Sequence, residues 1–207
     1  MIVLADAAND PGLSPPVRTN GPLKVAYAGG FYAGRGLELI VALARALPGI
    51  SFNLAGGDAA DLAALGLPAP ANLLCHGYLA PASVDDFLRQ ADVLLAPYGT
   101  RVMVNHGRAL ETTRWCSPMK LFEYLAHGKA ILCSDLPVLR EVLRDGDDAL
   151  LLPPEDPGAW QAAIERLDQD RALAQRLGST ARADFLARHS WSQRAERLLE
   201  FVAERLG

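Results

Sequence analysis

Residues 25–40 read VAYAGGFYAGRGLELI. An apolar run, Val25–Ala28, is followed by a glycine-rich turn and then, from Leu37, by a leucine pattern of helical period. The same order of apolar run, turn and helix recurs along the chain. Such alternation is typical of a parallel sheet that is covered by helices on both faces. This stretch therefore predicts that an α/β domain begins near residue 23.

Six short apolar runs are the expected strands of that sheet. They lie at residues 25–28, 52–55, 73–75, 93–96, 130–133 and 149–152. The segments between them have helical period, and residues 157–205 are expected to be largely helical, with breaks near 168–170 and at Ser190. The predicted fold is a doubly wound, Rossmann-like parallel sheet of about six strands with a helical C-terminal segment.

The composition narrows the classes of function. The chain has 207 residues and a formal net charge of −4, whereas proteins that grip nucleic acid through its phosphates usually have a basic excess. No apolar run approaches the roughly 20 residues of a membrane-spanning helix, and the first residues do not resemble a signal peptide. The three cysteines form no CxxC pair, which favours reduced thiols in the cytoplasm and predicts no metal site.

The chain is expected to divide near residue 22. Residues 9–22 are rich in proline, glycine and short polar side chains, all of which oppose regular structure. We interpret residues 1–22 as an interdomain segment and linker, and residues 23–207 as the folded domain.

The glycine-rich turn is the first candidate binding segment. Gly29 and Gly30 allow a ligand to approach the backbone closely, and Arg35 adds a charge just before a helix N-terminus, where anions bind. The spacing matches neither GxGxxG nor the P-loop signature. On its own, therefore, the turn is explained equally well as a flexible connection with a solvated arginine.

The second candidate segment is residues 117–128, SPMKLFEYLAHG. Ser117 can cap a helix, Pro118 suits its first position and Gly128 suits its exit. Lys120 and Glu123 share one face of this helix. At the helix N-terminus the amides of Met119 and Lys120 can bind a phosphate, while Glu123 can accept hydrogen bonds from a ribose. The alternative is a surface pair of Lys120 and Glu123, worth only about 0.2–0.5 kcal/mol.

Taken together, these motifs resemble the carboxyl-terminal domain of retaining glycosyltransferases of the GT-B fold (group 1, family 4). The resemblance covers about residues 22–205 and is carried by residues 25–30, 35–40, 54–57, 76–78, 91–98 and, above all, 117–130. It implies that residues 23–207 bind a nucleotide-diphospho-sugar, UDP- or GDP-linked, and that its hexosyl group passes to an acceptor hydroxyl with retention. No metal and no separate cofactor are implied.

The resemblance also assigns roles to residues. It implies that Gly29, Gly30 and Arg35 meet the diphosphate, that Ser117, Pro118, Met119 and Lys120 form the second phosphate-binding segment, that Glu123 binds ribose and that Tyr78 lies near the base. The expected partners are the nucleotide-sugar donor and an N-terminal acceptor-binding domain, in cis or in trans, without which the chain is expected to be inactive. The expected setting is polysaccharide biosynthesis in the cytoplasm, with peripheral membrane association of the full-length protein left open.

One departure from the family pattern keeps alternatives open. The first glutamate of the family's paired-glutamate motif falls at Trp115, eight positions before Glu123, so contacts to the donor sugar differ here. This departure favours the alternative of a non-catalytic nucleotide-sugar-binding module. A nucleotide-sugar epimerase remains a further alternative, because it can share the same architecture. A dinucleotide-dependent oxidoreductase is disfavoured, because the glycine spacing is wrong and the expected acidic residue is absent.

Overall fold

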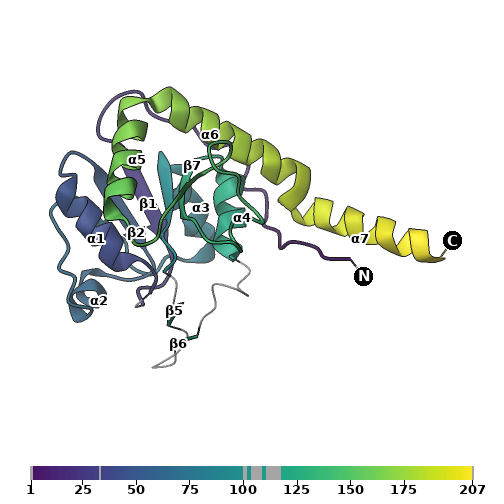
Figure 1. Cartoon of the computed structure of the whole chain (residues 1–207), viewed down its shortest axis with the longest axis horizontal. Helices are drawn as coiled ribbons and strands as arrows, with labels where there is room; N and C mark the ends of the chain where they lie inside the picture. Colours follow the sequence, from purple (N-terminus) through teal and green to yellow (C-terminus); the bar gives the residue numbers. More distant parts are fainter. Residues whose placement is uncertain (1, 33, 100–101, 104–108, 111–117, 207) are drawn as a thin grey trace.

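The computed structural model describes residues 2–32, 34–99, 102–103, 109–110 and 118–206. Its centre is a six-stranded sheet in which every pairing is parallel (Figure 1). The strands are β1 (Lys24–Ala28), β2 (Ser51–Ala55), β3 (Leu73–Cys75), β4 (Val93–Ala96), β7 (Ala130–Ser134) and β8 (Leu150–Leu152). The six strands predicted from the sequence are confirmed to within about one residue at each end.

The strand order places a crevice at the centre of the sheet. Across the sheet the order is β3-β2-β1-β4-β7-β8, so the chain first winds outward from β1 and then crosses back to β4. This is the doubly wound order 3-2-1-4-5-6, in which ligands bind beyond the carboxyl ends of the strands where the winding reverses. Here that point lies between β1 and β4, so the loops that follow Ala28 and Ala96 face it.

Side chains alternate between two hydrophobic clusters, one on each face of the sheet. In β4, for example, Val93 and Leu95 belong to one cluster while Leu94 and Ala96 belong to the other. The first cluster is covered by α1 (Leu37–Ala46), α2 (Ala59–Ala64), α5 (Pro157–Gln169) and the start of α6 (Arg171–Asp184). The second is covered by α3 (Pro81–Arg89), α4 (Met119–His127) and the end of α6. A separate antiparallel pair, β5 (Val102–Met103) with β6 (Ala109–Leu110), stands apart from the sheet.

The C-terminal helices break where the sequence predicts. Asp170 ends α5 and caps α6, with its carboxylate accepting the Leu173 amide at 2.9 Å. After α6 the backbone forms a π-helical turn, η2 (Phe185–His189), and Ser190 then adopts an extended conformation before α7 (Trp191–Leu206). Such wide turns are rare and bend the helical path.

The start of α4 differs from the prediction by one position. The helix begins at Met119, and Pro118 precedes it with φ −82° and ψ 76° instead of occupying the first helical position. Pro118 contributes its carbonyl, which accepts the Leu121 amide at 2.8 Å. The predicted cap, Ser117, lies outside the described residues, whereas Gly128 ends the helix with φ +61° as expected.

The proline-rich segment before β1 packs along the domain. Arg18 and the amide of Lys24 both bind the buried carboxylate of Asp92, and the buried Lys129 ammonium donates to the Pro15 carbonyl at 2.7 Å. Closer to the N-terminus, Ala8 forms a parallel bridge with Ser190. Residues 9–22 thus lack regular secondary structure, as predicted, and yet this segment is held by buried polar contacts.

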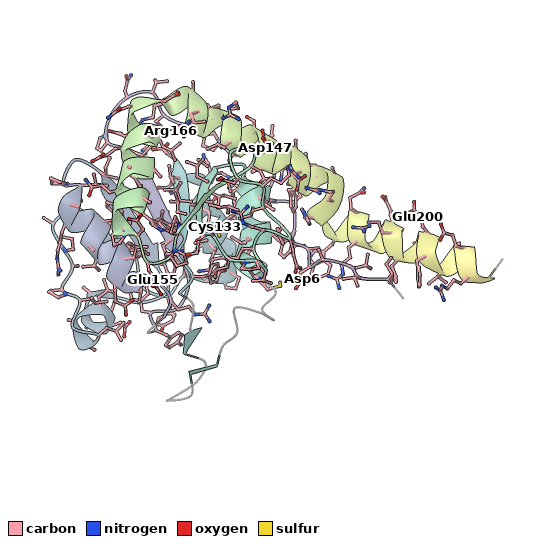
Figure 2. The ribbon with its side chains drawn as sticks, viewed as in Figure 1. Asp6, Cys133, Asp147, Glu155, Arg166 and Glu200 are labelled. Atoms are coloured by element: carbon pink, nitrogen blue, oxygen red, sulfur yellow. The ribbon has the colours of Figure 1, made fainter. Side chains whose placement is uncertain are left out.

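Helix α7 leads away from the body of the molecule. Figure 1 shows it beside the N-terminal segment, and Figure 2 places Glu200 on its projecting part, far from Arg166 on α5. Its exposed face carries Leu198, Leu199 and Val202. None of the described helices is long and apolar enough to cross a membrane.

Candidate functional site

A cavity of about 790 Å³ opens at the carboxyl edge of the sheet. Its walls come from the loops after β1, β3 and β4, from helices α3 and α4, and from the segment before β1 together with the first residue of α7. The residues that line it are Ala7, Ala8, Asn9, Pro11, Ala28, Gly29, Arg35, Leu79, Pro81, Val84, Asp85, Tyr98, Pro118, Met119, Lys120, Glu123, Ala126, His127 and Trp191. The cavity therefore lies at the point where the topology predicts a ligand.

Two glycine loops pack together to form one wall. The Gly29 amide donates to the Ala55 carbonyl at 2.9 Å, and Gly56 adopts φ +115° beside it. A methyl group on Gly56 would lie 2.2 Å from the Gly29 carbonyl oxygen, and one on Gly57 would lie 2.4 Å from the Phe31 ring. Because no other residue type fits there, the second loop fixes the path of the first.

Two cationic side chains, Lys120 and Arg35, line the cavity at the end near Tyr27. The Lys120 ammonium lies 4.2 Å from the centre of the Tyr27 ring and 5.4 Å from that of Tyr98. Arg35 lines the same end, forms no ion pair with a described residue, and has a buried Nε atom without a hydrogen-bond partner. Burial raises the pKa of Tyr27 to about 12, although the charge of Arg35 opposes the rise, so this phenol stays neutral. With two cations and a neutral phenol, this end of the cavity can bind an anion.

Acidic side chains lie farther along the cavity. Glu123 follows Lys120 by one helical turn on α4 and is exposed to the cavity. Desolvation raises the pKa of Glu123, the negative charge of Asp85 adds to the rise, and Lys120 opposes it. Asp85 on α3 accepts from Nε2 of the buried His127 at 3.1 Å. No group of three or more His, Cys, Asp or Glu residues in the described part of the chain is arranged to hold a metal ion.

Tyr124 has a structural role beside the site. Its hydroxyl accepts the Ala28 amide at 3.0 Å and donates to the Leu95 carbonyl at 3.3 Å. The Tyr124 side chain is fully buried. Tyr124 fixes α4 against β1 and β4, which in turn fixes the height of Lys120 and Glu123 over the sheet edge.

Most of the predicted site residues come together in this cavity. Gly29, Arg35, Pro118, Met119, Lys120 and Glu123 all line it. Gly30 adjoins Gly29, and its Cα position is covered by the Tyr32 ring. Tyr78 does not line the cavity: it is 74% exposed and lies beside Tyr32, while the next residue, Leu79, faces the cavity. Ser117 and Trp115 lie outside the described residues.

Several lining residues were not predicted from the sequence. Asp85 and His127 are far apart in the chain, and nothing in the sequence pairs them. The signal for Asp85 was its position on α3, because Pro81, Val84 and Asp85 follow the i, i+3, i+4 spacing of one helical face. The N-terminal wall, Ala7–Asn9, and Trp191 could not be foreseen, because only the tertiary fold brings them together.

A family model described as "Glycosyl transferase-like" matches residues 35–200, which is most of the chain. The chain belongs to this glycosyl transferase-like family. Among curated proteins, a phosphatidyl-myo-inositol mannosyltransferase of Mycolicibacterium smegmatis is 40% identical over 73 residues, which cover 35% of this chain and 18% of that protein. The chain therefore spans much less than the full length of this relative.

Solved structures share the fold of this glycosyl transferase-like domain. Sucrose-phosphate synthase from Thermosynechococcus elongatus matches 97% of the chain and 51% of its own, with a TM-score of 0.73 and 19% identity. Anabaena HepE in complex with UDP-glucose matches 88% of the chain and 49% of its own, with a TM-score of 0.66 and 16% identity. The C-terminal domain of a Francisella tularensis glycosyl transferase group 1 protein matches 83% and 88%, with a TM-score of 0.58 and 13% identity. The predicted fold, one half of a GT-B architecture, is confirmed.

Proposed function

We propose that this domain is the donor-binding half of a retaining glycosyltransferase. It binds a nucleotide-diphospho-sugar in the cavity, and the hexosyl group passes from there to an acceptor hydroxyl. The observation that carries the proposal is that Arg35 and Lys120 line one cavity together with Gly29 and with Glu123, which lies one helical turn from Lys120. A diphosphate fits the cations, and a ribose diol fits the carboxylate.

The two cations have a chemical role in this proposal. During transfer, the bond between the sugar C1 and the diphosphate oxygen breaks, a bond from C1 to the acceptor oxygen forms, and the acceptor proton is released. The leaving nucleoside diphosphate gains negative charge, which Arg35 and Lys120 stabilise from fixed positions. The backbone at Met119 and Lys120 adds the positive end of the α4 dipole, with Ser117 and Pro118 leading into it.

The proposal includes a second domain, which completes the glycosyltransferase. The chain spans 51% of sucrose-phosphate synthase and 49% of HepE, the structures that it matches over most of its own length. The segment before β1 and helix α7 both lie at the cavity and lead away from the sheet. We infer that they connect to or contact an N-terminal acceptor-binding domain, in cis or in trans. Polysaccharide synthesis at the cytoplasmic side of a membrane is the setting that we propose for the whole protein.

One observation favours a second candidate, a nucleotide-sugar-binding module without turnover. Trp115 occupies the position where the resemblance to family 4 enzymes places a carboxylate. A module of this kind would bind the donor with the same cations and the same ribose contact. The two candidates differ only in whether sugar leaves the nucleotide once an acceptor half is supplied.

Calorimetry with nucleoside diphosphates on the purified chain tests the proposal. We expect wild-type protein to bind, and Arg35→Ala to weaken binding about tenfold to a hundredfold, because one charge-assisted contact contributes roughly 1.5–3 kcal/mol. Arg166→Ala removes the same charge from α5, none of whose residues lines the cavity, and should leave the affinity unchanged (Figure 2). Equal affinity of the wild-type and Arg35→Ala proteins would refute the phosphate-binding role.

A further inference from the structure

The cavity extends past the proposed ribose contact. Lys120, Glu123 and His127 lie along one side of α4 and all line the cavity. With a rise of 1.5 Å per residue, Lys120 and His127 are about 10 Å apart along the helix axis. A diphosphate at Lys120 and a ribose at Glu123 therefore leave the region near His127 for the base. This inference rests on the proposed function.

The walls of this outer region are mostly apolar. Leu79 enters from the loop after β3, Pro81 and Val84 from α3, and Ala126 from α4. Apolar walls suit a purine or pyrimidine ring, but they do not distinguish one base from another. Discrimination must come from polar groups, and Asp85 provides a carboxylate among these apolar side chains.

The Asp85 carboxylate is held in place by His127. Its Oδ1 lies 3.1 Å from Nε2 of His127, whose side chain is only 1% exposed, whereas the Asp85 side chain is 53% exposed. The other ring nitrogen of His127, Nδ1, is buried without a hydrogen-bond partner in the described structure. Burial lowers the pKa of His127, and although Asp85 opposes this, a neutral ring that donates from Nε2 is the form we assign. Asp85 thus keeps acceptor capacity that faces the cavity.

We propose that Asp85 selects guanine, so that the donor is GDP-linked. The Watson–Crick edge of guanine presents two adjacent donors, N1–H and N2–H₂, which match the two oxygens of a carboxylate. Uracil presents a single N–H between two carbonyl oxygens, and a carboxylate repels both of these. Adenine presents one amino donor beside a ring-nitrogen acceptor. Among these bases, only guanine pairs with Asp85 without placing an acceptor against it.

The Asp85→Asn variant provides the test, because it preserves size and keeps an oxygen for His127. An amide offers one acceptor and one donor, which match N3–H and O4 of uracil but not the two donors of guanine. Calorimetry on the 207-residue chain with GDP, UDP and ADP should show GDP binding about tenfold or more tighter than UDP in the wild type. The variant should lose that preference through weaker GDP binding and stronger UDP binding.

The control is the neighbouring carboxylate. Asp86 is exposed, pairs with Arg89 and does not line the cavity, so Asp86→Asn removes the same charge one residue away and should keep the GDP preference. UDP binding as tight as GDP in the wild type, or an unchanged ratio in Asp85→Asn, would overturn the guanine assignment and leave the proposed function standing. If none of the three diphosphates binds, the proposed function fails as well.

Discussion

In the proposed function, the residues on one side of α4 contact different parts of a nucleotide. Lys120 is positioned by two aromatic rings, Tyr27 and Tyr98, which fix its charge at the glycine loop. Glu123 lies one turn farther on and is close enough to Asp85 for that charge to raise the pKa of Glu123. The two neighbours on one helix therefore meet different parts of a ligand, which makes their effects separable.

Because Lys120 and Glu123 are assigned to different parts of the ligand, their variants should respond differently to a nucleoside, a monophosphate and a diphosphate. Glu123→Ala should weaken all three by a similar factor, about tenfold, because each of them carries the ribose. Lys120→Ala should weaken the diphosphate most and leave the nucleoside nearly unchanged. Isothermal titration calorimetry of both variants measures the pattern, and Glu155→Ala, an exposed carboxylate that does not line the cavity, is the control. A Glu123→Ala effect confined to the diphosphate would contradict the ribose assignment.

At this scale the sequence predicted residues that lie on short, local motifs. Arg35, Lys120 and Glu123 stand beside glycines and a helix start, and those local signals placed them at the sheet edge. The pairing of Asp85 with His127 was not predictable, because it depends on how α3 packs against α4. Tyr78 was predicted for the base from resemblance, but its side chain lies outside the cavity beside Tyr32, so its role stays a prediction.

At the scale of elements, the shape of the site depends on two strand-to-helix loops in contact. Gly56 has a positive φ and lies against the Gly29 carbonyl, so it has both a conformational and a steric reason to be glycine. Gly66 has a positive φ too, at +74°, but nothing lies within 4 Å of where its methyl would be. An alanine at Gly66 would therefore cost only the strained backbone conformation, whereas an alanine at Gly56 would also collide with the Gly29 carbonyl.

We therefore predict unequal losses of stability for two alanine variants. Gly66→Ala should lower the free energy of unfolding by about 1–2 kcal/mol, the cost of a left-handed alanine. Gly56→Ala should lower it by about 2–5 kcal/mol, because the added methyl also displaces the Gly29 backbone. Chemical denaturation followed by circular dichroism measures both values. Similar losses in the two variants would show that the loops separate easily and do not fix each other.

The elements themselves were predictable where periodicity is strong. All six sheet strands followed from short apolar runs, and the C-terminal breaks followed from Asp170 and Ser190. The first turn of α4 was misplaced by one residue, because Pro118 suits either side of a helix start and local backbone geometry decides between them. The π-helical turn at Phe185–His189 has no sequence signature that distinguishes it from an ordinary helix.

At the scale of the whole molecule, the chain contributes one wall of an active site in the proposed function. It provides cations and a carboxylate for a donor, whereas the proposal assigns the acceptor to another domain. Positioning two reactants against each other contributes roughly 7–11 kcal/mol of barrier reduction in favourable cases. A domain that holds only one of them forgoes most of that contribution.

We predict that the 207-residue chain binds a nucleotide sugar without transferring the sugar. Mass spectrometry of products with simple glycoside acceptors should show no transfer above background, although calorimetry shows binding. Supplying an acceptor-binding half, fused or as a separate chain, should restore transfer, and Arg35→Ala should abolish the restored activity. Efficient transfer by the isolated chain would contradict the two-domain proposal, while binding that never becomes productive with the added half would favour the non-catalytic module.

The contacts of the N-terminal segment with α6 and with the start of α7 also have a consequence for how the protein folds. Arg182 binds Asp10 across 172 positions of sequence, and Arg194 binds the Ala5 carbonyl across 189. Contacts that close such long loops cost chain entropy and contribute little while the sheet is unformed, so we expect them to form last. In the folded protein they are also the first to open, because residues 2–10 can detach without breaking a hydrogen bond of the sheet. One wall of the cavity is thus formed by a segment that we expect to dock late, so the cavity is completed only after the sheet has formed.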